Sequence, residues 1–362
     1  MSVVTPIAPG PVAPRRRVRL RARPDALVLH AGLLVAAIGV GTVSLGHVDL
    51  SRLGDAGLIT ALPATWFVAV ALLTVSFFGL LARPRHPAWL LWAHVLAAIV
   101  FLHGVTGFVE ATPRFPTAWV HAGFAEHIMS HHGTLPDLDA RFSWPGFFST
   151  AALVASAGGV SPMWLVRWAP LAVNLATLIP LVAIFRTAGV GDRVRWVALW
   201  LFVVGNWVGQ DYFAPQALGF LLFLVFVAVL LARFRPAGQD LPGAAWLAGR
   251  LPHRRVARRA AAVTALESPA VDAAPAVRAA LVVVLLGITA AAIVSHQLTP
   301  FALVTATAAL VVGRRTTLGW MPMLILVAAV AWISYAAVTY WSGHLADVTG
   351  GLGRLGASVG AG

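Results

Sequence analysis

The chain has 362 residues, of which 59% are hydrophobic and 11% are charged, and its mean hydropathy is +0.83. Soluble globular domains are about half apolar and a quarter charged, so this composition excludes a soluble globular protein. There is no cysteine, which excludes disulfides, thiolate nucleophiles and cysteine-ligated metals. The 26 basic residues, all of them arginine, outnumber the 13 acidic ones and leave a net charge of +13.

Long apolar runs follow a Pro-rich and then Arg-rich segment at the start of the chain. About 20 apolar residues in a helix cross the hydrocarbon core of a bilayer, so each run is a predicted transmembrane helix. The runs cover residues 26–45, 61–82, 87–108, 163–187, 195–209, 215–233, 279–297, 299–313 and 319–341. The first run is long for a signal peptide and no A-x-A-like cleavage site follows, so we predict an uncleaved anchor. The sequence therefore predicts an all-α polytopic protein of the cell membrane with about nine transmembrane helices.

These runs divide the chain into five expected parts. They are a disordered basic tail (1–25), three membrane spans (26–108), an outer loop (109–162), a transmembrane core (163–341) with a basic inner loop (234–278), and a Gly-rich outer tail (342–362). A short apolar segment, Pro145–Ala157, lies inside the outer loop. A full crossing there would move the basic inner loop outside, so we expect a surface or re-entrant helix instead.

The positions of the arginines predict the orientation. With the N-terminus inside and the spans alternating, 21 of the 26 arginines fall in inner loops or at inner helix ends. Such an excess on one side is the positive-inside pattern of membrane proteins. It explains the net charge of +13 without nucleic acid, and the basic loops have few interleaved aromatic residues, so no nucleic-acid partner is predicted.

The outer loop contains a second unusual helix. The segment Ala118–His131 has apolar residues at helical spacing, with His121, Glu126, His127 and His131 between them. We therefore expect an amphipathic helix on the membrane surface, with these polar residues away from its apolar face. His127 and His131 have a spacing that metals use, but nothing in the spacing supplies an acidic third ligand, so no metal site is predicted.

Two later outer turns are polar where the chain is otherwise apolar. They are "NWVGQDYFAPQ", Asn206–Gln216, and "SHQLTP", Ser295–Pro300. A charged side chain at the bilayer centre costs about 2.5–3.5 kcal/mol on insertion scales, so such groups usually serve a function. We predict that the spans beside both turns are short, and that Asp211 and His296 line one outward-opening cavity with residues 137–141.

The order of these features resembles the C-type integral-membrane glycosyltransferases, particularly large actinobacterial-type relatives. The match lies in Gly133, Trp144–Phe148, Gly158–Gly159 and Arg167–Pro170, followed by the two polar turns, and extends over about residues 88–341. The acidic pair that the family has before its surface helix is missing here, where the chain reads "TAWVHAGF". The family's C-terminal region is also missing, as expected of a truncated chain.

The resemblance implies transfer of a sugar from a polyprenyl-phosphate donor to an acceptor on the outer face. The implied partners are the lipid-linked sugar and membrane lipids; no cofactor is specified, although a divalent cation, Mg²⁺ or Mn²⁺, could assist. Two alternatives remain. A degenerate, non-catalytic relative would act as a membrane scaffold. A transporter would be expected to show internal repeats and midplane charges, and the sequence shows neither.

Such a transfer requires a base for the acceptor hydroxyl and cations for the departing phosphate. The candidate catalytic carboxylates are Asp139, Asp137, Glu126 and Glu110. Asp139 is the first choice, because the neighbouring carboxylate of Asp137 is expected to raise its pKa toward neutrality. The candidate phosphate- and substrate-binding residues are Arg141, Arg114, Arg167, His121, Asp211, Tyr212, His296 and Gln297.

Overall fold

The computed structural model describes residues 24–113, 116–206, 211–236 and 274–342, and within these ranges the chain forms helices and no strand. The all-α class is therefore confirmed. The main helices are α1 (Pro24–Leu45), α2 (Ala64–Leu81), α3 (Ala88–His103), α5 (Pro116–His131), α6 (Gly146–Gly158), α7 (Pro162–Thr187), α8 (Asp192–Gly205), α9 (Pro215–Arg233), α12 (Pro275–Ser295), α13 (Thr299–Val312) and α14 (Met321–Tyr335). Short helical segments are α4 (Val105–Val109), η1 (Leu50–Arg52), η2 (Leu58–Thr60) and η3 (Ala140–Ser143).

Each predicted apolar run overlaps one of these helices, although α8 and α12 begin three and four residues before the predicted starts. Helices α1, α2, α7, α9 and α12 contain apolar segments of 18 to 26 residues and are long enough to cross a membrane. Helices α3, α6, α13 and α14 are apolar but only 13 to 16 residues long. The predicted single span over 87–108 is wrong in detail, because the helix ends at His103 and the short α4 follows Gly104.

Several predictions fall outside the described residues. These are the basic tail up to residue 23, Arg114, residues 237–273 of the predicted inner loop, and the Gly-rich tail from residue 343. The prediction of short spans beside both polar turns is half right. Helices α8 and α13 have 14 residues each, whereas α9 has 19 and α12 has 21.

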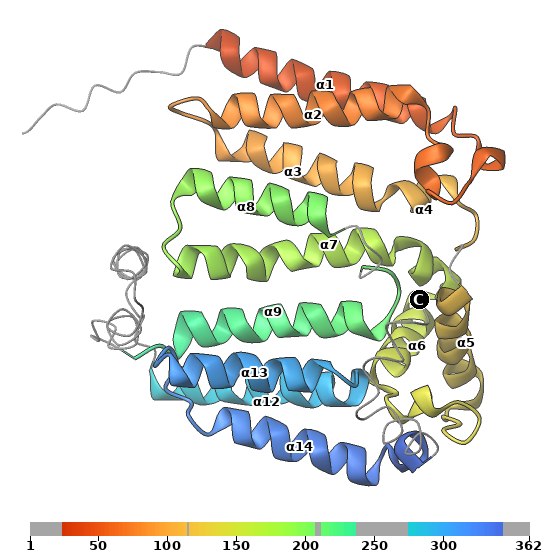
Figure 1. Ribbon diagram of the computed structural model, residues 1–362, viewed down its shortest axis with the longest axis vertical. Coiled ribbons are helices and arrows are strands. Elements are labelled where there is room, and N and C mark those ends of the chain that lie inside the picture. The colour runs from red at the N-terminus through yellow and green to blue at the C-terminus, as the bar shows by residue number, and fades with distance from the viewer. Residues whose placement is uncertain (1–23, 114–115, 207–210, 237–273, 343–362) are drawn as a thin grey trace, which may run out of the picture.

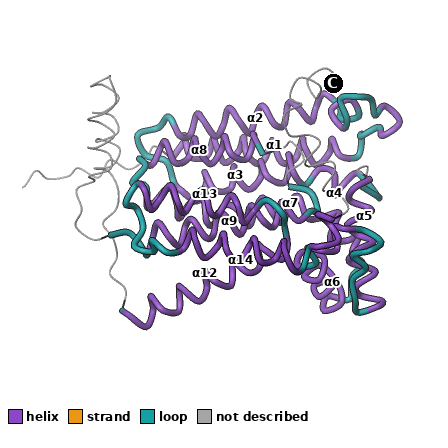
Figure 2. The backbone as a smooth tube through the Cα atoms, turned by 60° about the horizontal axis from the view of Figure 1, so that its bottom comes forward, coloured by secondary structure: helices purple, strands orange, loops and turns teal. Residues whose placement is uncertain are grey.

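The long helices lie side by side with roughly aligned axes, from α1 at one edge of the molecule to α14 at the other (Figure 1). Helices α5 and α6 lie across one end of this bundle, and they remain at that end in the rotated view (Figure 2). We term it the α5/α6 end. The opposite end, where the connections α2–α3, α7–α8 and α13–α14 lie, is termed the arginine end, because Arg83, Arg85, Arg193, Arg314 and Arg315 occur in or beside those connections.

Apolar side chains hold the bundle together in two main clusters. In one, α1, α2 and α3 pack with α7 and α8, and the ring of Phe77 stacks on Trp200 with centroids 4.2 Å apart. In the other, α9 packs with α12, α13 and α14 around the buried Phe226. Close packing of this kind gives many small dispersion contacts, which stabilise helix pairs even where the surrounding medium is apolar.

Helix α5 confirms the predicted helix at Ala118–His131, but the expected assignment of its faces is wrong. His121 is 4% exposed and points into the protein, whereas Trp119 is 49% exposed. The reason is that α5 packs against α6 and α7, so that the face formed by Ala118, His121, Ala122 and Ala125 is covered. The helical periodicity alone identified an apolar stripe, and it did not predict that protein would cover a histidine on it.

Helix α6 is the short helix predicted at Pro145–Ala157. It buries Phe147 and Phe148 against α5, α7 and α12. Gly146, its first residue, lies so close to α12 that a β-carbon there would meet Ser295 Oγ at 2.5 Å. The absence of a side chain at Gly146 therefore lets the start of α6 rest on the end of α12, next to His296.

Candidate active site

Segments far apart in the sequence meet at the α5/α6 end and enclose a cavity of about 250 Å³. They are α5, the segment from η3 to α6, the turn before α9 and the turn between α12 and α13. The lining residues are Thr117, His121, Arg141, Trp144, Phe148, Tyr212, Pro215, Gln216, Ser295, His296, Gln297 and Leu298. The predicted convergence of residues 137–141 with Asp211 and His296 is therefore confirmed for Arg141 and His296, and Tyr212 and Gln297 lie at the same cavity.

His121 offers a free lone pair to this cavity. Its Nδ1 is 2.9 Å from the carbonyl oxygen of Phe213, and because a carbonyl only accepts, Nδ1 must carry the hydrogen. Burial lowers the pKa of His121, and the positive charge of Arg141 acts in the same direction, although the Phe213 hydrogen bond opposes them. The ring is therefore neutral at pH 7. Its second nitrogen, Nε2, has no hydrogen bond in the described chain and can accept a proton.

His296 presents the opposite tautomer. Its Nδ1 accepts a hydrogen bond from the backbone nitrogen of Thr299 at 3.3 Å, and the Thr299 hydroxyl lies 2.9 Å from the same nitrogen. Since Nδ1 is the acceptor, a neutral ring carries its hydrogen on Nε2. Burial lowers the pKa of His296, which favours this neutral form. The cavity therefore contains one histidine, His121, whose Nε2 can accept a proton, and another, His296, whose Nε2–H can donate a hydrogen bond.

Arg141 is held in place by Asp139. Their side chains form a bidentate pair, with Nε 2.9 Å from Oδ1 and Nη2 2.6 Å from Oδ2, and Asp139 also accepts from the Arg141 backbone nitrogen. The guanidinium also lies over the ring of Phe124, 5.2 Å from its centroid. Asp139 thus occupies two of the guanidinium nitrogens, while Nη1 has no hydrogen bond in the described chain and is available to an anion.

The expected upward shift of the Asp139 pKa is wrong. The hydrogen bond from the Arg141 side chain holds the pKa of Asp139 below its usual value. The neighbouring carboxylate of Asp137 does not offset this, because Asp137 is exposed whereas the guanidinium is in direct contact. Asp139 is therefore ionised near neutral pH, and its carboxylate is paired with Arg141. A paired carboxylate with a lowered pKa is a weak proton acceptor, so Asp139 is less suited to act as the base.

Asp211 does not line the cavity, contrary to prediction, but is 93% buried beneath it. Its Oδ2 is 2.6 Å from Nδ1 of His103 and accepts from Nδ2 of Asn174 at 2.8 Å. His103 Nε2 lies 2.9 Å from the carbonyl of Val203 and must therefore donate to it. The hydrogen bonds of His103 therefore connect α3 both to the end of α8 and to the turn before α9.

This buried network positions the turn that forms part of the cavity. Asn174 also accepts from Nδ2 of Asn206 at 2.8 Å, so the network connects α3, α7 and both sides of the turn before α9. Tyr212 and Phe213 directly follow the anchored Asp211. The Tyr212 ring stacks on His121 with centroids 6.0 Å apart, and the Phe213 carbonyl accepts from the same histidine. Asp211 thus acts through its neighbours as a positioning residue.

A smaller hollow of about 60 Å³ adjoins the cavity, and Tyr212 lines both. Glu110 and Arg167 line the smaller one. The Nε of Arg167 donates to the carbonyl of Gly107, which holds the guanidinium beside this hollow. The structure therefore brings Glu110 and Arg167 together, at a hollow that His121 and His296 do not line.

The remaining predicted carboxylates are not at the cavity. Asp137 and Glu126 are exposed, and neither lines either hollow. The described residues contain no group of three or more metal-binding side chains. Mg²⁺ and Mn²⁺ prefer carboxylate oxygens, yet no carboxylate lines the 250 Å³ cavity. The described part of the site therefore does not fit a divalent cation.

Sequence reasoning missed the two residues that anchor the turn, His103 and Asn174. Both are polar residues within apolar runs, and both are buried. Ionisable and amide side chains inside membrane helices are usually paired and functional, so this signal was present. Gln216, which lines the cavity and donates to the Tyr212 hydroxyl at 3.0 Å, was also missed as a site residue.

No family model, curated protein or solved structure matches this chain. The chemistry of the cavity must therefore be inferred from the side chains that line it.

Proposed function

We propose that this chain is a membrane glycosyltransferase that uses a polyprenyl-phosphate-linked sugar at the α5/α6 end. The observation that carries the proposal is the pair of histidines of opposite tautomer beside Arg141 in one cavity. A proton acceptor, a neutral donor and a guanidinium are the groups that sugar transfer from a phosphate requires. The order of sequence features shared with the C-type glycosyltransferases supports the same function.

In the proposed step, the acceptor hydroxyl oxygen attacks the anomeric carbon of the sugar. The bond from that carbon to the phosphate oxygen breaks, and the leaving polyprenyl phosphate keeps its electron pair. His121 Nε2 takes the proton of the hydroxyl. Arg141 Nη1 and the Nε2–H of His296 donate to the phosphate oxygens, whose negative charge grows as the bond breaks. Leu298, 68% exposed at the rim of the cavity, offers an apolar edge toward the prenyl chain.

The proposal includes a topology of nine spans with the N-terminus inside and the α5/α6 end outside. Its support is the distribution of arginines, which are concentrated at helix ends opposite α5 and α6. In the described residues these are Arg83, Arg85, Arg186, Arg193, Arg195, Arg233, Arg235, Arg278, Arg314 and Arg315. Cysteines introduced at Ser130 and Ala245 test it, because they should be labelled from opposite sides of intact cells.

The test of the chemistry is His121→Asn. The asparagine amide can still donate to the Phe213 carbonyl, but the basic nitrogen is lost. We expect transfer from a panel of radiolabelled polyprenyl-phosphate pentoses and hexoses to fall by ~10²–10⁴, with donor binding unchanged. The matched control is His131→Asn, an exposed histidine on the same helix. Wild-type turnover in His121→Asn would exclude His121 as the base and leave Glu110 and Asp139 as candidates.

A second function, a non-catalytic relative that binds the lipid-linked sugar, is favoured by one specific observation. No carboxylate among the described residues lines the 250 Å³ cavity, and Asp139 is occupied by Arg141. If the chain is such a non-catalytic relative, we expect donor binding without turnover for every sugar in the panel. We also expect that His121→Asn changes binding and nothing else.

A further inference from the structure

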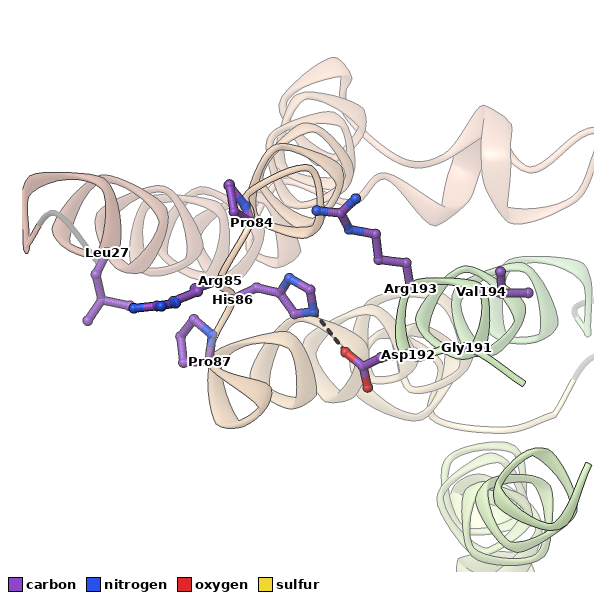
Figure 3. A pocket seen from close by; sticks show the side chains of 9 residues that line it. All are labelled: Leu27, Pro84, Arg85, His86, Pro87, Gly191, Asp192, Arg193 and Val194. Carbon is purple, nitrogen blue, oxygen red and sulfur yellow. Dashed lines mark hydrogen bonds and ion pairs between the residues drawn. The ribbon is translucent and has the colours of Figure 1, made fainter. Parts of the chain in front are cut away.

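A further hollow lies at the arginine end, away from the proposed active site. Its volume is about 800 Å³, and it is formed by the first turns of α1, the α2–α3 connection and the start of α8 (Figure 3). The lining residues are Leu27, Pro84, Arg85, His86, Pro87, Gly191, Asp192, Arg193 and Val194. Nothing in the proposed transfer reaction uses these side chains.

The positive charge of this hollow exceeds its negative charge. The acidic residue that lines it, Asp192, has both carboxylate oxygens occupied: Oδ2 is 2.8 Å from Nε2 of His86, and Oδ1 is paired with Nη2 of Arg195. Arg85 has no hydrogen bond in the described chain. Arg193 donates one hydrogen bond, to the carbonyl of Arg83 at 3.0 Å, and has no carboxylate partner. Among the described residues, these two guanidinium groups therefore have no carboxylate partner.

The hollow also has apolar walls beside the start of a candidate membrane span. Leu27, which begins the apolar segment Leu27–Leu45 of α1, lines it on one side and Val194, 60% exposed, on the other. In Figure 3, the side chain of Arg85 extends toward Leu27, while that of Arg193 extends from α8 toward Pro84, above the His86–Asp192 pair. Aliphatic side chains beside cations without a carboxylate partner, with Leu27 half-buried and Val194 exposed, suit a molecule with an anionic head and an apolar tail.

We infer that this hollow is a binding site for an anionic glycerophospholipid of the adjacent leaflet, with its phosphate between Arg85 and Arg193. A soluble polyanion would use the guanidinium groups but gain nothing from Leu27 and Val194. A zwitterionic lipid would use the apolar walls, but its positively charged choline would meet the same two arginines. An anionic lipid matches both features.

The experiment compares lipid binding to the full-length chain in detergent, by native mass spectrometry with phosphatidylglycerol and phosphatidylcholine of identical acyl chains. We expect preferential retention of phosphatidylglycerol. The double variant Arg85→Gln/Arg193→Gln should bind it roughly 25-fold more weakly, since each arginine near a membrane surface strengthens such binding about fivefold. The matched control is Arg52→Gln, an exposed arginine of η1 in the α1–α2 connection. It should bind phosphatidylglycerol as the wild type does.

A variant that is expected to preserve or strengthen lipid binding distinguishes loss of the site from loss of folding. Asp192→Asn removes the carboxylate of the hollow, so phosphatidylglycerol should bind at least as tightly as to the wild type. Equal retention of both lipids, wild-type binding by the double variant, or weaker binding by Asp192→Asn would overturn the inference. So would full displacement of the lipid by millimolar inorganic phosphate, which would indicate a site for a free anion.

Discussion

The two ends of the bundle hold their polar side chains in opposite ways. At the α5/α6 end, His121, Asp211 and His296 are buried or half-buried, and each is oriented by a hydrogen bond. At the arginine end, Arg85 and Arg193 are exposed and make few contacts. A buried polar group needs its partner, because an unsatisfied one loses its hydration without compensation. An exposed arginine stays hydrated and needs no hydrogen-bond partner from the protein.

This difference indicates where each kind of specificity lies. At the α5/α6 end the tautomer of each histidine is set by one neighbour, so the cavity has a definite arrangement of donors and acceptors. At the arginine end the field of several cations acts on whatever anion approaches, and no single geometry is required. Substitutions should therefore have large effects in the first region and graded effects in the second.

The strongest test of this comparison is Asp211→Ala. It removes the partner of His103 Nδ1 and one of the two acceptors of Asn174 Nδ2, which keeps its hydrogen bond to the carbonyl of Pro170. Removing one partner of a buried ion pair typically destabilises by about 3–5 kcal/mol, so we expect a greatly lowered unfolding temperature in detergent, followed by helical circular dichroism. Asp137→Ala, at an exposed carboxylate, is the control. If both variants unfold at the wild-type temperature, the network does not anchor the turn.

A smaller loss is expected from Gly219→Ala. A β-carbon at Gly219 in α9 would collide with Oγ1 of Thr299, the hydroxyl that contacts His296 Nδ1. Overpacking of this kind costs about 1–3 kcal/mol. We expect a lower unfolding temperature together with weaker donor binding, because the displaced Thr299 no longer orients His296. Gly287→Ala in α12 is the matched control, since a β-carbon there meets nothing within 4 Å.

The bundle was more predictable from the sequence than the cavity. Hydrophobic runs located the helices closely, since α9 begins and ends at the predicted residues 215 and 233. The periodic pattern could not show that His121 turns inward, because that depends on α6 and α7 covering α5. Nor could it show that Asp211 points to His103, which is 108 residues away in the chain. Long-range pairing between polar side chains has no local periodicity, so a single sequence does not predict it.

The pH dependence of transfer tests the charge environment of His121. Because burial lowers its pKa below the usual 6.5, the neutral, active ring persists below pH 6.5, and activity is lost as pH falls through the lowered value. The Arg141→Gln variant removes a charge that lowers the pKa of His121, and it frees Asp139, whose charge raises it. The acid limb of kcat/KM should therefore move to higher pH in this variant. If the acid limb of kcat/KM in Arg141→Gln lies at the same pH as in the wild type, His121 is excluded as the titrating group.

The smallest effect on transfer is expected from substitutions of Asp137 and Asp139. These substitutions also distinguish two roles for Asp139, as a residue that positions Arg141 or as the catalytic base. If Asp139 positions Arg141, then Asp139→Asn weakens donor binding more than it lowers kcat, because the guanidinium loses its bidentate partner. If Asp139 is the base, kcat falls by ~10²–10⁴ with donor binding intact. Asp137→Asn is the matched control, since that side chain is exposed and has no hydrogen bond in the described chain. Exposed substitutions usually change free energies by no more than about 0.5 kcal/mol, so its turnover should remain within about twofold of wild type. A large loss in Asp137→Asn, measured in the same assay, would return the catalytic role to the Asp137–Asp139 segment and reduce His121 to a structural histidine.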